Sequence, residues 1–240
     1  MNLFTTEELY VMASLLGKEF IIGVEGSTLE NNISDLKGMF KKNYSELEAK
    51  GVFEYRIDGT LLVDRDVGKM INVLNKADNV FVVVADCNGK KEKANYLSYG
   101  ELYCKLTEQG TQYLTEILDG FSYGSILEHY GISIPAAPVK KIDIGLNDFT
   151  AADSLYKSFN TEEADAYLSN LLEDPETEKL IRECLLNKNK AFVMKEYRRL
   201  GCRLVNVNEL ILKFTADHLL RFDINGADTV TVSIYRKEHD

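Results

Sequence analysis

Apolar residues recur at helical spacing in the first part of the chain. Thr5 or Thr6 can cap a helix whose first turn carries Glu7 and Glu8, since these acidic residues favour the positive end of the helix dipole. Leu9, Met12, Ala13 and Leu16 then fall on one side, and Gly17 ends the run. The same spacing predicts further helices over 27–40 and 44–50, the latter ending at Gly51.

A compact hairpin signal follows these helices. Val52, Phe53 and Tyr55 lead into Asp58-Gly59, the dipeptide best suited to a type I′ turn, and Leu61-Leu62-Val63 completes the second strand. Asp64 is placed to cap the next helix, whose buried side holds Val67, Met70, Ile71 and Leu74. Three helices, a small hairpin and a helix predict a winged-helix-like N-terminal part.

The pattern then changes from helices to strands. A β-branched run over 80–84 predicts the first strand, and 94–106 and 111–117 predict the next two, with a turn at Gln109-Gly110. A short helix is expected over 123–130. The paired prolines of 135–138 break regular structure and give the best candidate for a linker.

Helices and strands follow in the same order after the prolines. Helices are predicted from Asp148 or Thr150 to Phe159, over 161–172 and over 175–186. Strands are predicted over the ranges 191–197, 208–215, 218–224 and 230–235. This order predicts an α+β fold with a central antiparallel β-sheet flanked by two helical subdomains, formed by halves 1–134 and 139–240.

The two strand regions also contain similar segments. Glu101-Leu102-Tyr103-Cys104-Lys105-Leu106-Thr107 matches Glu209-Leu210-Ile211-Leu212-Lys213-Phe214-Thr215 at four of seven positions. Two amphipathic strands can look alike by chance, but the repeated order of elements favours a pseudo-twofold duplication of the fold.

The matched strands suggest a surface for binding another protein. Side chains alternate across a strand, so Leu102, Cys104 and Leu106 are expected in the core. The opposite face carries charged ends and an aromatic or aliphatic centre, as protein interfaces often do. The residues predicted to bind a partner on this face are Tyr103, Lys105, Ile211 and Lys213.

Charge and composition narrow the class of function. The net charge of −10 argues against binding to nucleic acid or to anionic membranes. No signal peptide, membrane span, phosphate-binding loop, metal-ligand spacing or nucleophile motif is present, and four scattered cysteines suit a reducing cytoplasm. We therefore expect a cytoplasmic binding protein with no catalytic residues, no cofactor and no metal, rather than an enzyme.

An alternative function remains open at this point. A winged-helix-like unit favours a DNA-binding regulator, in which Lys37, Lys41, Lys42 and Lys50 would face phosphates. Acidic residues mix with these lysines, among them Glu46 and Glu48, and favour an ordinary solvated surface.

The chain resembles the EspG family, the cytosolic chaperones of type VII (ESX-type) secretion, in a divergent Gram-positive form. The resemblance lies in the order of elements: the 5–17 helix, the 47–52 turn, Leu61-Leu62-Val63, the helix ending at 74–77 and the valine-rich strand. It implies recognition of secreted helical-hairpin substrates, which the chaperone keeps soluble and delivers to the membrane machinery. No single binding residue follows from it, and neither do the substrate, its affinity or the oligomeric state.

Overall fold

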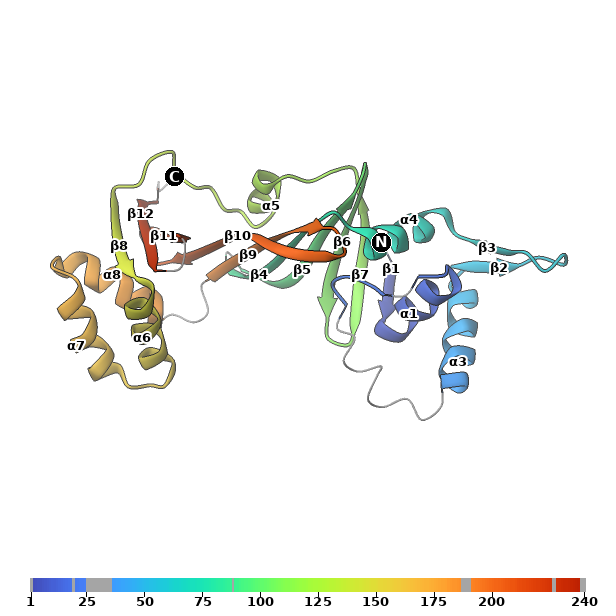
Figure 1. Cartoon of the computed structure of the whole chain (residues 1–240), viewed down its shortest axis with the longest axis horizontal. Coiled ribbons are helices and arrows are strands. Elements are labelled where there is room, and N and C mark those ends of the chain that lie inside the picture. The colour runs from blue at the N-terminus through green and yellow to red at the C-terminus, as the bar shows by residue number, and fades with distance from the viewer. Residues whose placement is uncertain are drawn as a thin grey trace. The chain divides into compact units, whose positions relative to one another are not determined.

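The computed structural model describes residues 2–18, 20–24, 36–87, 89–186, 191–225 and 228–237. Its residues form two compact units (Figure 1). Unit 1 comprises residues 1–83, 92–122 and 196–207, and unit 2 comprises 84–91, 123–195 and 208–240. The units interleave along the chain, while the division into halves at 135–138 stays a prediction.

The elements form two successive groups, each with helices followed by a run of strands, as expected. In chain order, the first group is β1 (Asn2–Thr5), α1 (Thr6–Leu15), α3 (Leu36–Ala49), β2 (Phe53–Tyr55), β3 (Leu61–Val63), α4 (Arg65–Lys76), β4 (Asn79–Cys87), β5 (Lys90–Tyr99), β6 (Leu102–Gln109) and β7 (Gln112–Leu118). The second is α5 (Tyr123–His129), β8 (Lys140–Gly145), α6 (Leu146–Lys157), α7 (Thr161–Leu171), α8 (Pro175–Leu186), β9 (Ala191–Leu200), β10 (Arg203–Phe214), β11 (His218–Asn225) and β12 (Thr229–Arg236).

Local sequence explains where the first helices begin and end. Thr5 caps α1 in a capping box, in which its hydroxyl accepts from Glu8 N–H and the Glu8 carboxylate accepts from Thr5 N–H. Asp64 caps α4 by accepting from Asp66 and Val67 N–H. The predicted break between helices 27–40 and 44–50 is wrong, because α3 runs unbroken from Leu36 to Ala49. The first nine residues of the 27–40 prediction lie outside the described residues.

The small hairpin is present, but its turn differs from the predicted type I′. Arg56 carbonyl accepts from Gly59 N–H, Gly59 has a φ of 81°, and neither Ile57 nor Asp58 has a positive φ. This is a type I turn followed by a left-handed glycine. The Asp58 carboxylate accepts from Thr60 N–H at 2.9 Å and stabilises the turn.

Ten strands form one large sheet, in the order β1-β7-β6-β5-β4-β9-β10-β11-β12-β8. Four strands, β4, β5, β9 and β10, contribute residues to both units. All strand pairs with described registers are antiparallel. They include the β2–β3 hairpin, which forms a separate two-stranded sheet. The mixed fold with a large antiparallel sheet is therefore confirmed.

The strand order corrects the alignment of the two repeats. In the first repeat, β1 precedes a group of helices and pairs with β7, the last of the four strands that follow them. In the second repeat, β8 likewise precedes a group of helices and pairs with β12, the last of the next four strands. Equivalent strands are therefore β6 and β11, or β5 and β10. The matched segments 101–107 and 209–215 instead belong to β6 and β10, so that sequence match does not mark equivalent positions.

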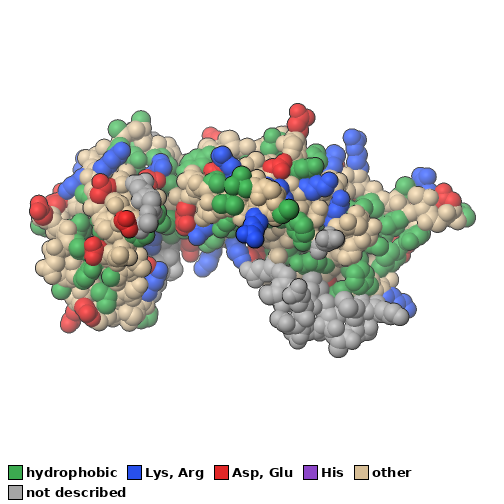
Figure 2. All heavy atoms as spheres, viewed as in Figure 1, with side chains coloured by type: hydrophobic (Ala, Val, Ile, Leu, Met, Phe, Trp, Pro, Cys, Tyr) green, Lys and Arg blue, Asp and Glu red, His purple; other side chains and the backbone are tan. Residues whose placement is uncertain are grey.

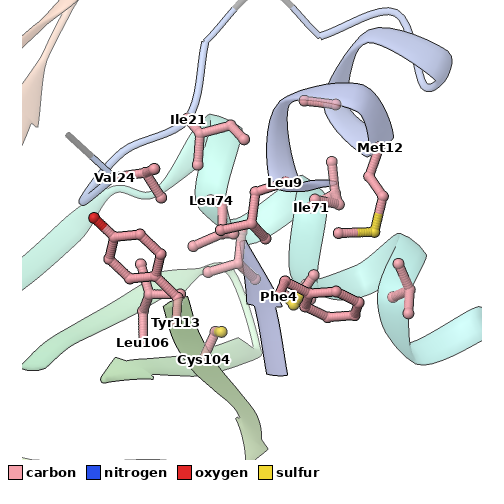
Figure 3. Packing of buried hydrophobic residues seen from close by; sticks show 14 of the residues in the cluster. Phe4, Leu9, Met12, Ile21, Val24, Ile71, Leu74, Cys104, Leu106 and Tyr113 are labelled. Atoms are coloured by element: carbon pink, nitrogen blue, oxygen red, sulfur yellow. The ribbon is translucent and has the colours of Figure 1, made fainter. Parts of the chain in front are cut away.

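The core of unit 1 lies between helices and one face of the sheet. Figure 3 shows Phe4 of β1 and Leu9 of α1 packing with Leu74 of α4 and with Cys104 and Leu106 of β6. All five are buried. The prediction that alternate residues of 102–106 face the core is confirmed.

Unit 2 has its own core against its own helices. Tyr156, Leu168 and Ile181 of α6, α7 and α8 pack against Phe222 of β11 and Val232 of β12. Strand β8 was not predicted, although it supplies Ile144 to this core. The predicted strand 94–106 was also wrong, because Gly100, with a φ of 57°, turns the chain between β5 and β6.

Candidate protein-docking surface

The predicted partner-binding residues of β6 lie on the sheet face of unit 1 that is turned away from the helix-covered core. Tyr103 is half-buried, with its ring edge-to-face against Phe121 at 5.5 Å. Lys105 is buried at 7% exposure, and its ammonium group lies 2.8 Å from the Glu92 carboxylate and 5.4 Å from the Tyr96 ring centre. Both side chains are engaged within the chain.

The predicted residues of β10 lie on a different kind of face. Ile211 is half-buried and packs with the core formed by α6, α7 and α8. Lys213 is also half-buried, and burial lowers the pKa of its ammonium group, while the nearby Asp153 carboxylate opposes that shift.

The expectation of one shared exposed face is therefore wrong. Tyr103 points away from the helices of unit 1, whereas Ile211 points towards those of unit 2. The physical reason is the misaligned repeat, which equated strands that carry their apolar residues on different faces. Whether any of the four residues binds a partner stays a prediction.

An exposed apolar surface does exist at the β9–β10 turn in unit 1. Tyr197 and Leu204 both pack against the helix-covered core. Because side chains alternate along a strand, Leu200, Val205 and Val207 must lie on the opposite face. Their exposed fractions are 63%, 40% and 45%. We call these three residues the β9–β10 strip.

Backbone and side-chain contacts hold this hairpin against unit 1. Arg199 N–H donates to Asp78 carbonyl at 2.8 Å, and the Arg199 guanidinium donates to Ala77 carbonyl at 2.9 Å. Gly201, with a φ of 62°, allows the turn. In the β10–β11 pair, Ile211 lies opposite Phe222. If this register continued towards the start of β10, strand β11 would end at Asn225 before reaching the position opposite Val207. The shorter neighbouring strand partly explains why the strip is exposed.

The strip has cationic neighbours. Arg203 is exposed on β10, with no ion-pair partner within the described part of the chain, and Arg198 is exposed and pairs with Glu196. By alternation both arginines share the face of the strip. Arginine is enriched at protein interfaces, and an uncharged apolar centre is typical of their cores, so this composition is compatible with an interface.

Sequence reasoning missed this surface although a signal was present. The predicted strand began at Asn208, whereas β10 begins at Arg203. The segment Val205-Asn206-Val207-Asn208 alternates apolar and polar residues and is a strand pattern. Its apolar side is the exposed one, which alternation alone does not reveal.

Cys202 gives a chemical probe beside the strip. It is exposed, whereas Cys87, Cys104 and Cys184 are buried. Burial raises the pKa of Cys104 and of Cys184 to about 12, so their reactive thiolate forms are scarce at pH 7. We expect a maleimide to label the native chain once, at Cys202, and the unfolded chain four times. Peptide mapping checks this, and native labelling of Cys104 or Cys184 would contradict the burial of those thiols.

Among the described residues, no group of three His, Cys, Asp or Glu side chains is arranged to hold a metal ion. No helix within the described ranges is long and apolar enough to cross a membrane.

Comparison with known proteins gives a likeness of fold. No family model matches the chain, and no curated protein matches it in sequence. Among solved structures, it is similar to the Mycobacterium tuberculosis type VII secretion system chaperone EspG5, determined in complex with a PE25-PPE41 dimer. The TM-score is 0.66 at 10% identity, over 99% of this chain and 91% of EspG5. The chain therefore has an EspG-like fold.

Proposed function

We propose that this chain is a cytoplasmic chaperone that binds a secreted helical protein of a type VII secretion system, and that it is not an enzyme. The observation that carries the proposal is the likeness to EspG5, which extends over 99% of this chain. A likeness over both units supports a shared role better than a likeness to one common subdomain would.

The β9–β10 strip supports the same function. Helical-hairpin proteins expose apolar tips that aggregate unless another surface covers them. Leu200, Val205 and Val207 offer an aliphatic surface of that kind, and Arg203 offers a cation for a carboxylate at its edge. We propose that the strip forms part of the docking surface for the substrate.

Co-expression tests the proposal. Each helical-hairpin protein encoded beside this gene is expressed with the chain and analysed by size-exclusion chromatography. We expect at least one stoichiometric complex. The double variant Val205→Asp/Val207→Asp should lose it, because two carboxylates would have to be buried in the interface.

Val139→Asp serves as the matched control, since Val139 is 66% exposed and belongs to unit 2. It should keep the complex. Failure of every neighbouring candidate to bind would argue against the chaperone role, whereas a complex that survives the double variant would remove the strip from the docking surface.

Two of the four lysines that suggested the DNA-binding alternative lie close to carboxylates. Lys50 lies 2.5 Å from the buried Glu8 carboxylate, and Lys42 lies 3.9 Å from Glu46. Neither presents an uncompensated charge to a phosphate. We expect no shift of a DNA duplex in a low-salt gel, and a clear shift would revive this alternative.

A further inference from the structure

The turn between α6 and α7 in unit 2 contains an unusual residue. Phe159 N–H donates to Tyr156 carbonyl and Asn160 N–H donates to Leu155 carbonyl, which closes the helix end with Phe159 at a φ of 63°. Every other described residue with a positive φ is a glycine. A bulky side chain is unfavourable in this left-handed conformation, which glycine adopts freely.

The ring of Phe159 is also exposed. Its exposed fraction is 82%, so contacts within the chain cover only a small part of its surface. Glycine at this position would fold more easily and leave no aromatic ring in water. Most of the ring is therefore accessible, and an accessible aromatic ring on a tight turn is suited to packing against another molecule.

The surrounding helices are strongly acidic. Residues 146–186, which form α6, α7 and α8, contain ten acidic and three basic side chains, and so carry −7 of the chain's net charge of −10. Figure 2 shows Asp and Glu side chains spread over this part of the surface.

Only part of this negative charge is neutralised locally. Lys140 pairs with Asp174, Lys157 pairs with Asp153, and Arg182 pairs with Asp165 and Glu178. Glu162 and Glu163, in the first turn of α7 just after Phe159, are exposed and have no cationic partner within the described ranges. A ligand that docks on Phe159 therefore meets uncompensated carboxylates.

We propose that the α6–α7 turn docks a basic amphipathic helix of another protein. The apolar side of that helix packs against the Phe159 ring, and its Lys or Arg side chains pair with Glu162 and Glu163. A second copy of this acidic chain, or a nucleic acid, would be repelled by the same charges. This site is independent of the β9–β10 strip and of the substrate proposed for it.

A synthetic helix tests the proposal on the full chain. The probe is an 18-residue peptide with leucine on one side and lysine on the other, and its twin carries glutamate in place of lysine. By fluorescence anisotropy we expect the lysine peptide to bind with a Kd on the order of 10 µM, and the glutamate twin not to bind.

Two variants separate docking on the ring from general attraction between opposite charges. Phe159→Gly should weaken binding at least about 10-fold while raising Tm, because glycine relieves the left-handed backbone, so unfolding cannot explain the loss. Glu162→Gln/Glu163→Gln should weaken binding several-fold and reduce its salt dependence. Phe20→Ala, at a phenylalanine of unit 1 that is 48% exposed, should leave affinity unchanged. Equal affinity for Phe159→Gly and wild type, or no binding of the lysine peptide, would overturn the proposal.

Discussion

Replacing Ile211 by aspartate is expected to lower the free energy of unfolding by about 3–5 kcal/mol. Ile211 packs into the helix-covered core of unit 2 and lies opposite Phe222 in the β10–β11 register. A carboxylate at that position would lose the apolar contacts and would be partly desolvated, and the nearby Lys213 ammonium group already interacts with Asp153. Urea denaturation followed by circular dichroism measures the change.

The same strand provides a matched control. Val205→Asp places the same side chain six residues earlier on β10, where the native valine is 40% exposed. Its carboxylate stays in water, so we expect a change within about 0.5 kcal/mol. Equal stability losses for the two variants would mean that Ile211 and Val205 do not differ in burial as described.

Replacing Lys50 by methionine is expected to destabilise unit 1 by about 2–4 kcal/mol. This lies towards the lower part of the range for broken buried ion pairs, because the Lys50 side chain is itself 41% exposed. The Glu8 side chain is fully buried and accepts from Thr5 N–H at 2.8 Å and from Lys50 Nζ at 2.5 Å. Methionine keeps the volume of the side chain but leaves the buried carboxylate without its cation.

Lys69→Met is the control for this change. Lys69 pairs with Asp66 at 2.9 Å, but both side chains are more exposed than Glu8, so the loss should be about 0–1 kcal/mol. Glu8→Gln combined with Lys50→Met should recover part of the stability, because no buried charge then remains. The explanation fails if Lys50→Met costs no more than Lys69→Met.

Sequence patterns predicted most elements because their signals are local. Thr5 and Asp64 cap helices where expected, and the buried side of α4 carries Val67, Met70, Ile71 and Leu74. The edge strands β1 and β8 escaped prediction since neither is long enough to show a clear alternation: β1 has four residues and β8 begins with two lysines. Both are recognised only through their partners, β7 and β12.

The docking surface was less predictable because it depends on which face of each strand the helices cover. Alternation places Tyr103 with Lys105 and Ile211 with Lys213, but it does not say whether that side meets a helix. In β6 it is the side without the unit's core helices, and in β10 it is the side with them. Long-range packing, which a single sequence does not encode in any short window, decides this.

Hydrogen exchange on the chain, alone and in a purified complex with its substrate, tests the docking proposal most directly. The account predicts slower exchange at the amides of 200–207 in the complex, where a partner covers the β9–β10 strip, with little change in the buried strands of unit 2. A stoichiometric complex in which 200–207 exchange as fast as in the free chain would contradict it.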